Sequence, residues 1–306
     1  MPIALGLVAR AQTPVSEIDR SSQRRCSRSQ SHVTGVRVSY QRTLVELAFP
    51  PMRWNKVKSS NSDTPDVLDL SFLHCVYRQP QSASAAAQSL WSWYPHAVGV
   101  VVIDDGGIAP QHSTDPRVST TKLNQRLSVT TNGLYLNEQT VDVFVDHVLE
   151  ACAFGREWLF ILEDDVRVLG PITSELEFDL NGFNPRVRLP RPINIELLKA
   201  MRRPLFRGYG GCGGALLRTT TLMKSPMSEV RRFLRRAIDV TGRPLGSDEV
   251  LSAWVLYNRG RLGSYEGFAE TFYPDFPLLL ESGRVAVLHQ YKDDYVRDTA
   301  PDHDAG

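Results

Sequence analysis

The stretch that decides the fold is "EWLFILEDDVRVLG", residues 157–170. Five apolar or aromatic residues, 158–162, run without interruption into three adjacent carboxylates, Glu163, Asp164 and Asp165. An unbroken apolar run of this length is typical of a strand that is buried on both faces of a parallel sheet. The carboxylates would then lie at the carboxyl end of the strand, where open α/β sheets bind their ligands.

Alternating strand and helix patterns precede this stretch. Residues 67–77 and 97–103 are predicted strands, and 82–94 is a predicted helix that Pro95 ends. A second helix is expected over 140–153, where apolar residues recur at helical spacing and Asn137 or Thr140 can cap the first turn. This order predicts an α/β fold with a mostly parallel sheet covered by helices on both faces.

The composition is that of an ordinary globular protein. Of the 306 residues, 42% are hydrophobic and 23% charged, and the formal net charge of +1 selects neither nucleic acid nor membrane as a partner. We expect a basic, Arg/Ser-rich N-terminal arm at 1–66 with possible short strands, one domain at 67–295 and a disordered tail at 296–306. The arm is compatible with a solvated tail, a nucleic-acid-binding segment or a targeting segment.

Cysteine usage and hydropathy bear on the compartment. The cysteines, at 26, 75, 152 and 212, are far apart and form no CxxC pair, which argues against structural zinc and a disulfide framework and favours a reducing compartment. No segment approaches the roughly 18 apolar residues that span a bilayer. We therefore expect a cytoplasmic protein.

The acidic triplet itself suggests a metal site. Side chains alternate along an extended chain, so Glu163 and Asp165 point to one side and Asp164 to the other. Two carboxylates on one side repel each other unless a cation lies between them, and oxygen ligands favour Mg²⁺ or Mn²⁺. Such a metal can hold a diphosphate. The alternative is that the acids cap a turn or pair with Arg156 and Arg167.

The motif "FILEDDV" resembles the D-x-D region of nucleotide-sugar glycosyltransferases of the GT-A fold. It is especially similar to the "LEDDV" form of that region in the lipopolysaccharide and procollagen galactosyltransferase-like group. The resemblance, over roughly 67–292, implies a Rossmann-type GT-A sheet. It also implies that Asp165 binds the metal that holds the sugar-nucleotide diphosphate. Glu163 departs from the usual first Asp, and Asp164 is the effective first acid if the register differs.

The same resemblance assigns the nucleotide contacts. The loop after the first strand would place Tyr77 on the base and Arg78 near a phosphate, and Asp104 or Asp105 in "DDGG" would read the base or ribose. An ordinary loop and a plain turn are the alternatives for these two segments.

A glycine-containing segment, "YGGCGGALLRTTTL" at 209–222, resembles the one that lines the donor-sugar and acceptor pocket in this superfamily. The resemblance implies that Gly213, Gly214 and Arg218 contact the ligand. Four glycines within six residues also suit a place where a bulky ligand touches the main chain. The alternative is a glycine-rich surface loop.

Two C-terminal segments complete the resemblance. "LGSDEVLSAWVLYNRG" at 245–260 resembles the acidic pair that opens a helix, which makes Asp248, with Glu249 second, the general base for the acceptor hydroxyl in an inverting reaction. The alternative is a first helical turn that Ser247 caps and the helix dipole favours. In "GRVAVLHQYKDD" at 283–294, His289 would complete the metal site and Lys292 would meet the diphosphate.

The sequence thus predicts a Mn²⁺- or Mg²⁺-dependent glycosyltransferase that transfers a sugar from a nucleotide-diphosphate donor to a hydroxyl-bearing acceptor. A UDP-sugar is the expected donor. A non-catalytic nucleotide-sugar or RNA-binding protein and a metal-dependent phosphohydrolase remain alternatives. A sugar-nucleotide pyrophosphorylase is disfavoured because the place after the first strand, "YRQPQSAS", lacks glycine.

A helix at 225–238, with Ser225 as N-cap and Pro226 at the first position, has one apolar face and four arginines on the other. The arginines suit either a solvated face or an anionic partner.

Overall fold

The computed structural model describes residues 68–76, 79–104, 106–130, 133–184, 188–202, 209–211, 213–270 and 276–290. The chain divides into two units, Met1–Ser59 and Ser60–Gly306, and every described residue belongs to the second. The predicted N-terminal arm and C-terminal tail lie outside the described residues.

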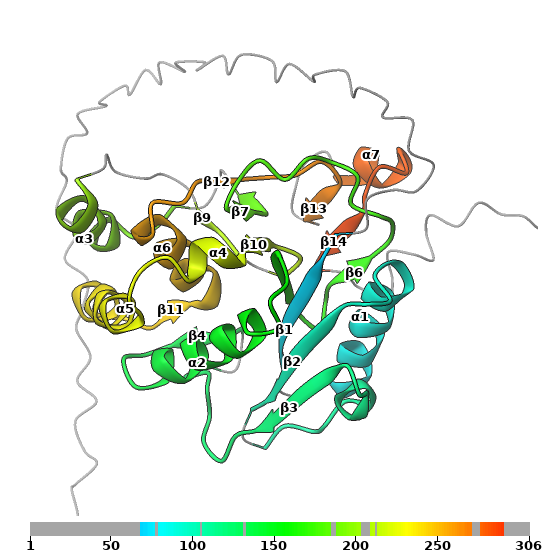
Figure 1. Ribbon diagram of the computed structural model, residues 1–306, viewed down its shortest axis with the longest axis horizontal. Coiled ribbons are helices and arrows are strands. Elements are labelled where there is room, and N and C mark those ends of the chain that lie inside the picture. Colours follow the sequence, from blue (N-terminus) through cyan, green and yellow to red (C-terminus); the bar gives the residue numbers. More distant parts are fainter. Residues whose placement is uncertain are drawn as a thin grey trace, which may run out of the picture. The chain divides into compact units, whose positions relative to one another are not determined.

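A seven-stranded sheet forms the centre of this unit (Figure 1). Strands β5, β1, β2 and β3 pair parallel to one another, whereas β10 runs antiparallel to both β5 and β7. The strand order, with bounds, is β12 (Leu262–Gly263), β7 (Leu180–Asn181), β10 (Leu216–Arg218), β5 (Trp158–Leu162), β1 (Leu70–Val76), β2 (Val98–Ile103) and β3 (Val118–Lys122). The predicted α/β class with a mostly parallel sheet is confirmed.

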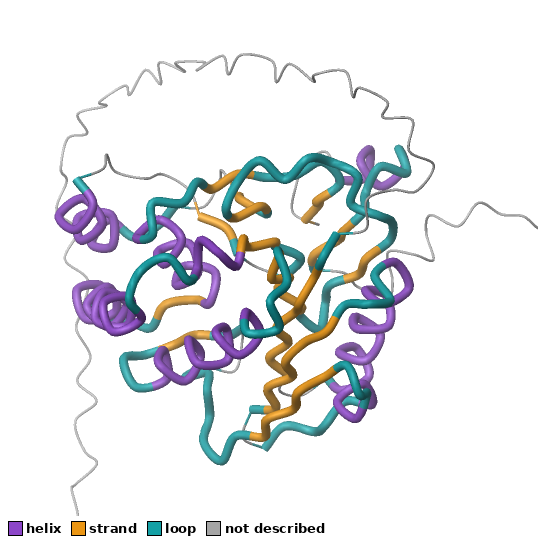
Figure 2. The backbone as a smooth tube through the Cα atoms, in the orientation of Figure 1, coloured by secondary structure: helices purple, strands orange, loops and turns teal. Residues whose placement is uncertain are grey.

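The apolar runs form strands because each face of the sheet has its own core. Val100 and Val102 of β2 belong to one buried cluster, and Val101 and Ile103, which point the other way, belong to the second. Helix α1 (Pro80–Trp93) packs on the second cluster. The first cluster is covered by α2 (Thr140–Cys152), α3 (Arg191–Met201), α5 (Met227–Thr241) and α6 (Ser247–Tyr257). Helices thus cover both faces, as predicted (Figure 2).

Two helix starts differ from the sequence prediction by one residue. Asn137 Oδ1 accepts the N–H groups of Gln139 and Thr140 at the start of α2, as expected. In α5, however, Pro226 and not Ser225 is the N-cap. In α6 the N-cap is Gly246, because the Glu249 carboxylate accepts the Gly246 N–H and caps the first turn from within the helix. The cap by Ser247, which the sequence analysis gave as the alternative for this segment, is therefore corrected to Gly246.

Short elements complete the unit. A three-stranded sheet has the order β13 (Phe268–Glu270), β14 (Val287–His289) and β6 (Arg167–Val168). Two ribbons pair β11 (Leu245–Gly246) with β4 (Tyr135–Leu136) and β8 (Phe183–Asn184) with β9 (Tyr209–Gly210). The remaining helices are η1 (Gln111–Thr114), α4 (Thr219–Leu222) and α7 (Phe276–Glu281). Within the described ranges, no helix has both the length and the apolar character needed to cross a bilayer.

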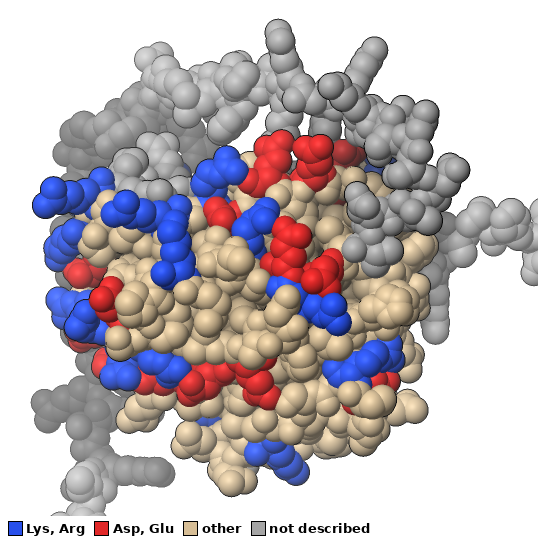
Figure 3. Space-filling view, in the orientation of Figure 1, with Lys and Arg blue, Asp and Glu red and all other residues tan. Residues whose placement is uncertain are grey.

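The basic face of α5 is engaged by acids. Arg231 pairs with Asp142 and Asp146 of α2, and Arg235 also pairs with Asp142. Basic and acidic side chains accordingly interleave on this part of the surface (Figure 3). The α5 arginines that the sequence analysis left open between solvent and an anionic partner thus include two that bind α2, a contact that the sequence analysis did not predict.

Candidate active site and metal centre

The topology brings two distant segments of the chain together. The acidic triplet follows β5 and leads directly into β6, and β6 pairs antiparallel with β14. This pairing places His289, the last residue of β14, beside Glu163, although 126 positions separate them in the sequence. The small sheet is therefore the scaffold of a cluster at the carboxyl end of β5.

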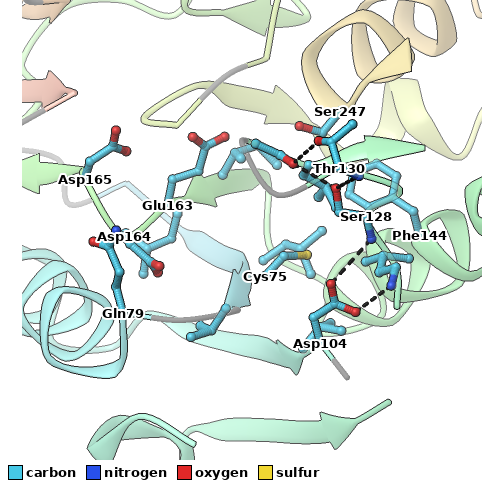
Figure 4. A pocket seen from close by; sticks show the side chains of 18 residues that line it. Cys75, Gln79, Asp104, Ser128, Thr130, Phe144, Glu163, Asp164, Asp165 and Ser247 are labelled. Atoms are coloured by element: carbon cyan, nitrogen blue, oxygen red, sulfur yellow. Dashed lines mark hydrogen bonds between the residues drawn. The ribbon is translucent and has the colours of Figure 1, made fainter. Parts of the chain in front are cut away.

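Three of the predicted metal ligands converge in this cluster. His289 Nε2 lies 3.3 Å from Glu163 Oε2 and 3.8 Å from Asp165 Oδ1. One donor atom from each of the three residues lies within 4.8 Å of the others. Figure 4 shows the carboxylates of Glu163 and Asp165 directed to one side of the chain and that of Asp164 to the other.

Asp164 does not join the cluster. Its Oδ1 lies 3.0 Å from Nε2 of His74, a fully buried residue in the middle of β1. Nδ1 of His74 lies in turn 3.2 Å from Nε2 of His112, a buried residue of η1. Because alternation along the chain turns Asp164 away from its neighbours, its expected role as a metal ligand is corrected. Of the two arginines weighed as partners, Arg156 pairs with Asp69, and Arg167 donates to the main-chain oxygens of Asp164 and Val166.

Electrostatics in the cluster favour a bound cation. Burial raises the pKa of Asp165, and the charges of Glu163 and Asp164 add to that effect. For Glu163 burial acts in the same direction, but the hydrogen bond and charge of His289 outweigh it, so the pKa of Glu163 is lowered. Two crowded carboxylates and an imidazole nitrogen form a donor set that fits Mn²⁺, which accepts mixed oxygen and nitrogen ligands, and in its oxygen part Mg²⁺.

Gly213 lets the main chain touch the cluster. Its N–H donates to the Glu163 carboxylate, and a Cβ at this position would lie 2.6 Å from Val166 Cγ2 and 2.9 Å from His289 Cδ2. Gly214 has φ of +86°, and its Cβ would lie 2.7 Å from Val287 Cγ1. The two glycines are thus required by close packing against the cluster and against β14.

A cavity of about 320 Å³ opens beside the cluster. Glu163, Asp164 and Asp165 form one rim, and the opposite wall includes Ser128 and Thr130 (Figure 4). The floor is apolar and comes from the ends of β1, β2 and β5 and from α2; it includes Leu73, Val102, Phe144 and Ile161. A volume of this size suits the ring of a nucleoside or a sugar.

Asp104 stands at the end of β2 in the wall of this cavity. Its carboxylate accepts the main-chain N–H groups of Leu127 and Ser128, so that it ties the 127–130 segment to the sheet. The sequence analysis missed the contribution of this loop, because no pattern in the sequence shows where Ser128 and Thr130 turn. Four predicted nucleotide contacts, Tyr77, Arg78, Asp105 and Lys292, lie outside the described residues.

The two acids at the start of α6 have different surroundings. Glu249 is buried, pairs with Arg243 and accepts the Gly246 N–H, so its carboxylate stabilises the helix start. Asp248 has its pKa raised to about 7, first by burial and then by the charges of Glu249 and Glu163. The charge of Asp248 thus interacts with that of Glu163 in the cluster.

Arg218 does not reach the site. Its register partner is Trp158, the first residue of β5, so it lies at the opposite end of the strand from the acidic triplet. The guanidinium pairs with Glu157 and stacks on Trp158, 4.3 Å from the ring centroid. Because β10 runs antiparallel to β5, its far end points away from the cavity, and the expected ligand contact of Arg218 is corrected.

Comparison with known proteins gives structural neighbours only. No family model matches the chain, and no curated protein matches it. It is similar to the galactosyltransferase LgtC, solved with donor and acceptor sugar analogues, at 14% identity over 73% of this chain and 87% of that one, with a TM-score of 0.42. It is also similar to core-mannan synthase A from Aspergillus fumigatus in a Mn/GDP form, at 8% identity over 64% and 71% of the two chains, with a TM-score of 0.39. A third is mouse xyloside xylosyltransferase 1, at 11% identity over 72% and 97%, with a TM-score of 0.39.

These neighbours are glycosyltransferases, the class whose D-x-D region the acidic triplet resembles. At these identities and TM-scores, the likeness identifies no donor, acceptor or metal for this chain.

Proposed function

We propose that the chain is a metal-dependent glycosyltransferase that moves a sugar from a nucleotide-diphosphate donor to a hydroxyl group. The observation that carries the proposal is the cluster of Glu163, Asp165 and His289 at the rim of a cavity of about 320 Å³. Carboxylates and an imidazole at the carboxyl end of a parallel strand suit a divalent cation, and the adjacent apolar cavity suits the organic part of a nucleotide sugar.

Each residue has a role in this proposal. Glu163, Asp165 and His289 hold the cation, which would neutralise the negative charge of the departing diphosphate. The cavity between the triplet and Ser128 holds the nucleoside, with Asp104 in its wall. Asp248 accepts the proton of the acceptor hydroxyl if the reaction inverts the anomeric centre. The nucleotide contacts of Tyr77, Arg78, Asp105 and Lys292 remain predictions.

The test is a panel of UDP- and GDP-sugars with Mn²⁺, in which nucleotide release is measured with and without small hydroxyl acceptors. Wild-type protein should release nucleotide only with metal, and Asp165→Ala should reduce the rate by about 100-fold or more. Asp146→Ala is the matched control, because Asp146 is an exposed acid on α2 that pairs with Arg231 and not with the cluster.

Two outcomes would refute the proposal. If Asp165→Ala releases nucleotide at the wild-type rate, the cluster does not hold the essential metal. If the protein instead turns over simple phosphate esters and leaves every sugar nucleotide intact, the metal-dependent phosphohydrolase is the correct reading of the same cluster.

A further inference from the structure

A buried carboxylate lies behind the metal ligand His289. Glu270 is 2% exposed, and its Oε1 lies 3.1 Å from Nδ1 of His289. The other ring nitrogen, Nε2, faces Glu163 and Asp165. The imidazole is therefore held between one carboxylate on its outer side and the cluster on its inner side.

This contact follows from the strand register. β13 and β14 pair parallel, and Glu270 is the register partner of His289. Register partners on neighbouring strands point to the same face of the sheet. The same small sheet pairs β14 with β6, the strand that continues from the acidic triplet. One ladder thus positions the metal ligands and the carboxylate that supports one of them.

The contact decides which nitrogen of His289 is available. A carboxylate accepts hydrogen bonds, so Glu270 keeps a hydrogen on Nδ1 of His289. Nε2 is then the nitrogen that faces Glu163 and Asp165, and with a cation in the cluster it would present its lone pair to that cation instead of donating to Glu163. A carboxylate in this position also makes the ring a stronger donor to a metal and prevents its rotation.

We propose that Glu270 is a positioning residue for a divalent metal site: it holds His289 in the tautomer and orientation in which Nε2 completes the cluster with Glu163 and Asp165. The inference rests on the proposed function, because it presupposes that the cluster binds metal. It adds a residue that the sequence analysis did not select and that does not itself touch the metal.

Binding of Mn²⁺ alone tests the proposal without any turnover. Free Mn²⁺ is measured by its electron paramagnetic resonance signal during titration of full-length wild-type protein, Glu270→Gln and Glu270→Met, and the titrations are repeated with UDP and with GDP. Glu266→Ala is the matched control, because Glu266 is an exposed acid just before β13. Thermal unfolding in EDTA establishes which variants are folded.

We expect the Mn²⁺ dissociation constant to rise about 10- to 100-fold in Glu270→Met, which keeps the volume and removes the acceptor. Glu270→Gln, which keeps an acceptor oxygen but not the charge, should lose about 3- to 10-fold, and Glu266→Ala should match wild type. A purely packing role for Glu270 would change the unfolding temperature and leave the metal affinity of the folded variants unchanged.

A folded Glu270→Met variant with wild-type Mn²⁺ affinity would overturn the inference and leave the proposed function standing. If Glu270→Met does not fold, wild-type affinity in Glu270→Gln overturns it in the same way. If wild-type protein binds no Mn²⁺, alone or with either nucleotide, the proposed metal-dependent function itself fails and the inference fails with it.

Discussion

The substitution Gly213→Ala should disable the cluster without removing any ligand. The added Cβ would lie 2.6 Å from Val166 Cγ2, 2.9 Å from His289 Cδ2 and 3.0 Å from Glu163 Cβ. Carbon atoms pack at about 3.5–4.0 Å, so these neighbours must retreat by roughly 0.5–1 Å. Metal sites tolerate deviations of only about 0.2 Å in ligand distance, and two of the three neighbours, Glu163 and His289, are proposed ligands.

We therefore expect Gly213→Ala to weaken Mn²⁺ binding by about 10- to 100-fold, or about 1.4–2.8 kcal/mol. Overpacking should also lower the free energy of unfolding by about 1–3 kcal/mol. The assays are the Mn²⁺ titration and urea unfolding in EDTA, which separate the loss of affinity from the loss of stability.

Gly170→Ala provides the matched control at the end of β6. A Cβ there would lie 3.9 Å from Ala286 Cα, which is an ordinary contact, so stability should change by less than about 0.5 kcal/mol and Mn²⁺ affinity should not change. If Gly213→Ala binds Mn²⁺ as tightly as Gly170→Ala does, the packing of the main chain against the ligands is not what shapes the site.

Three further results are expected. Burial, followed by the charge of His74, lowers the pKa of His112 from 6.5 to about 3. Between these two pH values the unfolded chain binds a proton at this residue and the folded chain does not, so the free energy of unfolding should fall by about 2 kcal/mol between pH 8 and pH 5. Urea unfolding should show a shallower pH dependence of the unfolding free energy in His112→Asn than in wild type, and an unaltered slope would contradict this origin. Asp248→Asn should reduce nucleotide release with little change in unfolding temperature, whereas Glu249→Ala should cost about 1–2 kcal/mol of stability through the lost cap, and a reversal of these two effects would exchange the assigned roles. Saturating Mn²⁺ at about 100 times its dissociation constant should stabilise wild-type protein by about 2.7 kcal/mol, EDTA should remove that gain, and an equal gain in Asp165→Ala would place the metal elsewhere.

The parts of the site that the sequence predicted depend on local patterns. The apolar run before the triplet and the alternation of side chains were enough to place Glu163 and Asp165 on one side and Asp164 on the other. His289 was selected from the resemblance and from its place at the end of a short apolar strand, and the structure brings it to the cluster.

The parts that the sequence could not predict depend on strand direction and register. Arg218 was expected at the pocket from the resemblance of the segment 209–222, but nothing in that segment shows that β10 runs antiparallel to β5. Glu270 ends the three-residue strand β13, and its partner His289 is 19 positions away. His74 is a polar residue within the largely apolar strand β1, where no local signal shows that it faces Asp164.

The order in which strands occur along the chain has a consequence for folding. Every strand of the central sheet lies between positions 70 and 263, whereas the imidazole of the cluster and its supporting carboxylate arrive on β13 and β14, at 268–289. The packing of this late segment through Phe268, Ala286 and Val287 is what brings an imidazole to the pair of acids and completes the cluster that we propose binds a cation. During synthesis the layered body can therefore form before the cluster is complete, so a nascent chain acquires its architecture earlier than its proposed cation site.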